Sequence, residues 1–139
     1  MTNSDMPMMK ASSRVLSRSV LRPPDGHTAQ AISQAVIRIT RDYTGRGPTT
    51  AHTTINDNVI TVVLRETLLK AERTLITDGH GNAVTGMRRN FQASMRRELV
   101  AAVTEHSGRS VEAFLSDNAI DPDIAVEVFI LKPRGEPGD

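Results

Sequence analysis

Two apolar runs near the C-terminus constrain the fold of this chain more than any other feature. They cover residues 111–116 and 124–131, and an acidic segment separates them. The second run, Ile-Ala-Val-Glu-Val-Phe-Ile-Leu, is the most hydrophobic segment of the sequence. Residues of this type favour strands, so the pattern predicts a strand pair joined by an acidic turn. A chain of 139 residues has room for one core, and we expect that core to form on this pair.

Composition narrows the class of protein. The hydrophobic fraction is 38%, enough for one core, but only three Phe, one Tyr and no Trp are present, which disfavours stacking on nucleic-acid bases. A net charge of +1 gives no general attraction for polyanions, so no nucleic-acid partner is expected. The chain has no Cys, which excludes disulfides and thiolate metal sites and is typical of a reducing cytoplasm.

The distribution of apolar residues along the sequence also argues against insertion in a membrane. Every apolar run is far shorter than the roughly 20 residues that a membrane-spanning helix needs. Basic residues near the N-terminus are not followed by a continuous apolar block, so a secretory signal is not expected. We therefore expect a cytoplasmic protein with a flexible leader over residues 1–28, a folded domain over 29–132 and a disordered tail over 133–139.

Periodicity predicts the elements of the folded domain. Ile32, Val36, Ile39 and Tyr43 form one helical stripe, with Thr28 as the N-cap of a helix over residues 29–43. The other predicted elements are a hairpin over 49–55 and 59–64, a short helix over 68–76 with buried Leu68, Leu69, Leu75 and Ile76, a long helix over 83–106, and the closing strand pair.

This order, α-β-β-(short α)-α-β-β, predicts an α+β fold. We expect two layers: a four-stranded, mostly antiparallel sheet with helices on one face. The last strand is apolar on both faces, which leaves its second face to be covered. A homodimer would cover that face, and a monomer with a partly covered face is the alternative.

The acidic segment between the last two strands offers oxygen ligands. Its residues are Asp117, Asn118, Asp121 and Asp123, and Glu127 follows on the strand. Carboxylates of this kind can hold Ca²⁺ or Mg²⁺, but the spacing is not that of an EF-hand. Asp and Asn also form ordinary turns by bonding nearby backbone amides, so we expect a structural turn and no metal site.

Three arginines are candidates for binding an anion. Arg46 lies in Gly45-Arg-Gly-Pro48, which could cradle an anion or simply end the preceding helix. Arg88 and Arg89 lie on the long helix, where they could bind an anion or form ion pairs on a solvated flank. No nucleophile, phosphate-binding or dinucleotide motif accompanies them, so neither an enzyme nor a bound cofactor is expected.

Four blocks of the sequence lie within residues 29–131: Gly45-Arg-Gly-Pro48, Phe91-Gln-Ala-Ser-Met-Arg-Arg-Glu-Leu99, Phe114-Leu-Ser-Asp-Asn118 and Asp121-Pro-Asp123. Together, and over that whole range, they resemble the MpsC family, long known only as a domain of unknown function. The family is named for a sodium-translocating, membrane potential-generating system of bacteria. The resemblance implies an accessory or regulatory domain that contacts a membrane-transport subunit. A small-ligand or anion-binding module is the alternative.

Overall fold

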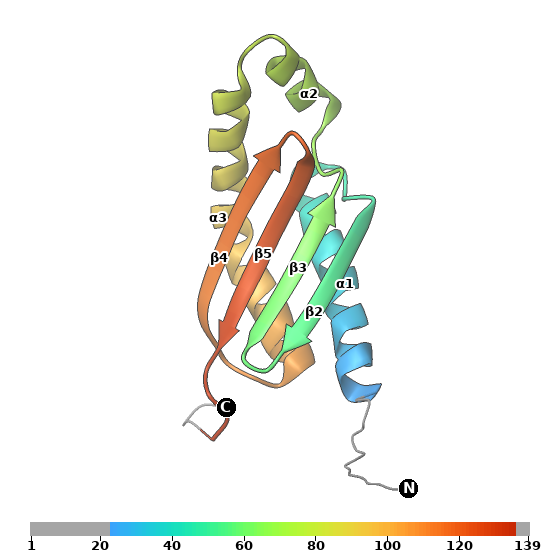
Figure 1. The fold of residues 1–139 in the computed structure, drawn as a ribbon, viewed down its shortest axis with the longest axis vertical. Helices are drawn as coiled ribbons and strands as arrows, with labels where there is room; N and C mark the ends of the chain where they lie inside the picture. Colours follow the sequence, from blue (N-terminus) through green and yellow to red (C-terminus); the bar gives the residue numbers. More distant parts are fainter. Residues whose placement is uncertain (1–22, 136–139) are drawn as a thin grey trace, which may run out of the picture.

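The computed structural model describes residues 23–135 (Figure 1). In chain order the elements are α1 (Pro23–Thr44), β2 (Thr50–Asn56), β3 (Val59–Arg65), α2 (Lys70–Thr77), α3 (Gly81–Ser107), β4 (Val111–Ile120) and β5 (Asp123–Leu131). The order and the α+β class predicted from the sequence are confirmed.

The four strands form one antiparallel sheet in the order β2-β3-β5-β4. The two most apolar strands, β3 and β5, therefore lie at the centre, and β2 and β4 are the edges. Helices α1 and α3 cover one face of this sheet, and α2 lies beyond one end of it (Figure 1). None of the described helices lies over the opposite face, so this part of the chain has two layers.

The core lies between the sheet and the helices α1 and α3. Fully buried side chains come from both layers, including Ile32 on α1, Leu99 on α3, and Ile60 and Phe129 on the central strands. Phe114 on β4 adds an aromatic contact, because its ring centroid lies 5.0 Å from that of Phe129. Alternate residues of β3 and β5 point into this core, and those between them point to the helix-free face.

The first helix is longer than the sequence predicted. It begins at Pro23, within the predicted leader, so Thr28 lies inside the helix and the N-cap prediction was wrong. Proline is compatible with the first turn of a helix, where its missing N–H leaves no bond unmade. The predicted leader otherwise falls on residues 1–22, outside the described part of the chain.

The short helix also differs in detail. It begins at Lys70, so Leu68 and Leu69 precede it, although Leu68 is buried as predicted. Leu75 is 37% exposed, which contradicts its predicted burial. The reason is that α2 lies at the end of the molecule, where only α3 and the preceding loop are close enough to cover it.

Candidate functional site

A buried ion pair joins the two helices at the end of the sheet. Arg88 on α3 donates from Nη1 to Glu72 Oε1 on α2 at 3.2 Å, and from Nη2 to the hydroxyl of Thr67 at 2.6 Å. Its Nη1 also reaches the carbonyl of Thr67 at 3.3 Å. Glu72 accepts a further bond from the amide of Leu69 at 2.7 Å. These bonds hold the guanidinium of Arg88 in one orientation, because its planar group presents several N–H donors in a fixed geometry.

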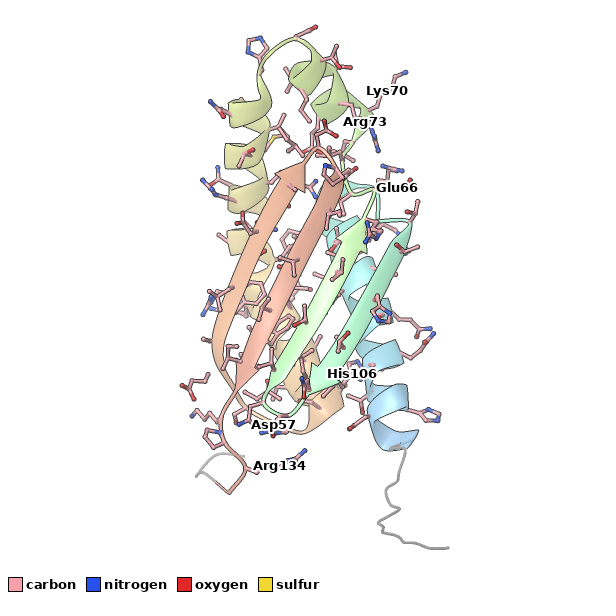
Figure 2. The ribbon with its side chains drawn as sticks, in the orientation of Figure 1. Asp57, Glu66, Lys70, Arg73, His106 and Arg134 are labelled. Carbon is pink, nitrogen blue, oxygen red and sulfur yellow. The ribbon has the colours of Figure 1, made fainter. Side chains whose placement is uncertain are left out.

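Asp123 holds the loop that leads into α2. Its carboxylate accepts bonds from the backbone amides of Thr67 and Leu68 and from the Thr67 hydroxyl, each at 3.1 Å. Arg73 on α2 approaches the same carboxylate at 3.3 Å, although Arg73 is half exposed. Figure 2 labels Arg73, Glu66 and Lys70 at this end of the sheet. The carboxylate therefore anchors the loop, and little of it is available to a ligand.

Arg46 reaches the same loop from the other side. Its Nη1 donates to the carbonyl of Leu68 at 2.8 Å. Gly45 has φ 84°, in the left-handed region, and its amide donates to the carbonyl of Arg41. The segment Gly45–Pro48 therefore ends α1, which is one of the two roles that the sequence suggested for it. Arg46 and Arg88 thus both contact the loop after β3, whereas Arg89 is exposed and lies in a separate groove.

A second polar cluster lies under the middle of α3. Glu127 on β5 is 2% exposed, and its carboxyl accepts hydrogen bonds from Ser116 on β4 and Gln92 on α3. Gln92 also accepts a bond from Asn118 at 2.9 Å. Burial raises the pKa of Glu127 to about 7, although the two hydrogen bonds and the nearby positive charge of Arg88 lower it. This carboxyl is therefore poised to change charge near neutral pH.

The predicted acidic turn is shorter than expected. Asp117 and Asn118 belong to β4, where they pair with Val126 and Ala125, so their assignment to the turn was wrong. Strand pairing runs as far as Ile120 opposite Asp123. It supplies backbone partners along the whole segment, which outweigh the turn preference of Asp and Asn. Only Asp121 and Pro122 form the connection.

The candidate acidic residues do not converge on one point. Asp117 and Asp121 are exposed, Asp123 binds the loop before α2, and Glu127 is buried against α3. Within residues 23–135, no group of three or more acidic or histidine side chains is placed to hold a metal ion.

A groove runs between α3 and the edge strand β4. One part encloses about 500 Å³ and is lined by Arg96, Arg97 and Glu112 together with small apolar residues. The adjoining part encloses about 280 Å³ and is lined by Arg89, Arg96 and Phe114, with Gln92 and Ser116 beside them. Arg96 lies over the Phe114 ring, 5.5 Å from its centroid. Of the three candidate arginines, only Arg89 lines this groove.

The helix-free face of the sheet is apolar at its centre. Its members are Val63 on β3, Ile124, Val126, Val128 and Ile130 on β5, and Leu115 on β4. Leu115 is 57% exposed, and the β-branched residues around it are half-buried by one another. Figure 2 shows side chains projecting from this uncovered face. Contiguous exposed apolar surface of this kind marks interaction sites.

The sequence did not single out Glu72, Thr67 or Gln92. Glu72 follows Leu69 by three residues, the spacing at which a Glu side chain reaches back to the first amide of a helix. Gln92 follows Arg88 by four residues, so both occupy the same side of α3. These two spacings are the sequence signals from which Glu72 and Gln92 could have been identified.

Fold and site together define a two-layer α+β domain with the buried Arg88–Glu72 ion pair at one end and, within the described residues, an uncovered apolar sheet face. Residues 25–133 match the family described as Na+-translocating membrane potential-generating system (MpsC). The chain therefore belongs to the MpsC family, as its sequence blocks predicted. Comparison with curated proteins and with solved structures gave no significant match. None of the helices within residues 23–135 combines the length and apolarity that crossing a bilayer requires.

Proposed function

We propose that this domain is a cytoplasmic accessory or regulatory subunit of a Na+-translocating, membrane potential-generating system, and that it acts by protein contact rather than by catalysis. Its membership of the MpsC family supports the link to such a system. The observation that carries the contact role is the helix-free sheet face, where apolar side chains of β3, β5 and β4 are left without a covering layer.

In this proposal the helix-free face joins two copies of the chain. A two-fold axis brings one surface patch against itself, so the patch must be self-complementary. An apolar centre satisfies this condition, because it contains no like charges that would meet across the axis. Polar residues lie toward the edges of the face, among them His52 and Thr54 on β2 and Asp117 on β4. An apolar centre with a polar rim is the usual anatomy of a stable interface.

The system-level part of the proposal is tested in the native host. The tagged chain is recovered from detergent-solubilised membranes, and the proteins retained with it are identified by mass spectrometry. We expect enrichment of an integral membrane subunit of an ion-transport system, and we expect deletion of the chain to lower the Na+-dependent membrane potential. A normal potential in the deletion strain, with no transport subunit retained, would contradict the proposal.

An anion-binding module remains the second candidate function, and Arg89 is the residue that favours it. Arg89 is exposed and lines the groove beside α3, whereas Arg46 and Arg88 already donate to backbone carbonyls or to Glu72. A thermal-shift titration with phosphate, nucleotides and divalent cations tests this function. Binding at 100 times Kd would stabilise the fold by about 2.7 kcal/mol, so an unchanged melting temperature at millimolar ligand would exclude it.

A further inference from the structure

We propose that the groove between α3 and β4 binds an acidic, extended protein segment, which adds to the free edge of β4 as a fifth strand. This inference rests on the proposed role in protein contact and names the surface and the chemistry of the partner. Three observations carry it: the edge position of β4, the shape of the groove and the arrangement of charge along α3.

Within residues 23–135, strand β4 pairs with another strand on one side only. It is the last strand in the order β2-β3-β5-β4, and it extends over ten residues from Val111 to Ile120. An edge strand presents unpaired backbone donors and acceptors, which an extended segment can satisfy. At the middle of this edge the carbonyl of Phe114 accepts a long bond, 3.4 Å, from Nη1 of Arg96. An incoming amide can replace that contact at little cost.

The groove provides room beside this edge for the side chains of such a segment. Its two adjoining parts share Ala93 and Arg96 and enclose about 500 and 280 Å³. The apolar side chains of Val100 on α3 and Val111 on β4 form part of its lining. Alternate side chains of an added strand would enter the groove, and those between them would extend the helix-free face of the sheet.

Charge along α3 is separated between its two flanks. Arg89 and Arg96, seven residues apart, lie within about 20° of each other around α3 on the flank beside β4, and Arg97 also lines the groove. Glu98 lies on the other flank, about 180° from Arg89, and accepts a 2.7 Å bond from the hydroxyl of Tyr43 on α1. No ion pair involves the three arginines within the described residues, and Glu112 is the one acidic residue lining the groove.

This charge pattern indicates which kind of partner the groove binds. A second copy of the chain docked at the same edge would bring its own three arginines toward these three, and like charges at close range oppose association. A segment carrying Asp or Glu at alternate positions would instead place negative charges beside these arginines. Electrostatic complementarity of this kind gives partner selectivity and speeds association. An anionic membrane surface would satisfy the charges, but it would not satisfy the strand edge.

The test uses the full chain and a fluorescein-labelled ten-residue peptide of alternating valine and glutamate, followed by fluorescence anisotropy. We expect saturable binding that weakens with added salt. Two control peptides, one with lysine in place of glutamate and one N-methylated at alternate residues, should not bind, because they lack the charge and the backbone donors respectively. Equal binding of the N-methylated peptide would overturn strand addition, and no binding of the parent peptide at millimolar concentration would overturn the whole inference.

Two double variants locate the site. Arg89→Glu with Arg97→Glu should weaken peptide binding by about tenfold or more, since it reverses two charges on the groove. Arg38→Glu with Arg41→Glu makes the same change in net charge on exposed positions of α1 and should alter binding by less than about twofold. Circular dichroism checks that both variants are folded. An equal loss in the two variants would show a nonspecific charge effect and would contradict a site in the groove.

Further experiments distinguish binding of a peptide from binding of other ligands, and distinguish this inference from the proposed function. Competition by inorganic phosphate at constant ionic strength would show a small-anion site, and binding only to vesicles containing phosphatidylglycerol would show a membrane surface; either result overturns the inference. A variant of the helix-free face on a strand that the added segment does not contact, Val63→Glu on β3, should alter self-association but leave peptide binding within about twofold. Failure of the peptide assay therefore does not depend on whether the domain belongs to a transport system.

Discussion

Arg88 on α3 and Glu72 on α2 form an ion pair whose charged atoms lie 3.2 Å apart, with side chains only 7% and 1% exposed. The pair lies 16 residues apart in sequence and closes the helical hairpin at the end of the sheet. Glu72 Oε2 is buried and has no hydrogen-bond partner among the described residues, so the carboxylate depends on Arg88 for compensation of its charge.

Replacing Arg88 by alanine should therefore be strongly destabilising. Arg88→Ala leaves Glu72 buried without its countercharge, a change that costs about 3–5 kcal/mol of unfolding free energy. The neighbouring Arg89→Ala removes an exposed side chain from the same helix and should stay within about 0.5 kcal/mol. Urea unfolding followed by circular dichroism measures both. A loss of less than about 1 kcal/mol in Arg88→Ala would show that the pair is not essential to the fold.

Removal of the Asp123 carboxylate should loosen the loop before α2. In Asp123→Ala, the amides of Thr67 and Leu68 lose their acceptor, so their hydrogen exchange should accelerate by about tenfold or more. Exchange in the central strands should change much less. Asp121→Ala, at an exposed position in the turn next to it, is the matched control. Equal exchange rates for the two variants would contradict the anchoring role of Asp123.

Glu127 should make stability depend on pH between about 4.5 and 7. The unfolded chain releases this proton near 4.5 and the folded chain retains it to about 7, so folding is favoured below 4.5 and this contribution is lost as pH rises through 7. The shift corresponds to about 3 kcal/mol at most.

The matched pair Glu127→Gln and Glu112→Gln isolates that contribution. Glu127→Gln keeps a neutral side chain at every pH, so the difference in unfolding free energy between it and the parent chain should grow as pH rises from 4 to 8. Glu112 is exposed on β4, and its glutamine variant should track the parent chain. A pH-independent difference for Glu127→Gln would mean that Glu127 does not titrate in this range.

Two glycines of α3 should respond in opposite directions to alanine. Gly86 lies on an exposed part of the helix with no atom within 4 Å of an added Cβ, so Gly86→Ala should stabilise by about 0.5–1 kcal/mol. Gly108 ends the same helix with φ 71°, so Gly108→Ala should destabilise by about 1 kcal/mol. Thermal unfolding of the two variants measures both signs. Stabilisation by Gly108→Ala would contradict the assigned left-handed cap.

The fold was predictable because it follows from local periodicity. The apolar runs of β3 and β5 and the helical stripe on α1 each specify an element, although β5 is apolar on both faces and its sequence leaves open which face is buried. The boundaries of β4 were not predictable, since Asp117 and Asn118 favour a turn until β5 supplies a backbone partner for each. Pairing with β5 therefore determined the conformation of Asp117 and Asn118.

The polar clusters were only partly predictable. Glu127 was recognisable as a carboxylate among apolar neighbours, but its partners Ser116 and Gln92 come from other elements. Asp123 was a candidate ligand for a cation, whereas it binds a loop 56 residues away in sequence. Contacts over such separations leave no trace in the spacing of residues along one helix or strand.

The molar mass of the purified chain in solution tests most directly the claim that the helix-free face joins two copies. Size-exclusion chromatography with light scattering should give about 30 kDa, twice the 15.2 kDa of one chain. Leu115→Glu places a charge at the most exposed apolar position of that face and should return the mass to about 15 kDa. The control Leu75→Glu on α2 should keep the larger mass. A monomeric parent chain, or a Leu115→Glu variant that remains dimeric, would contradict the account.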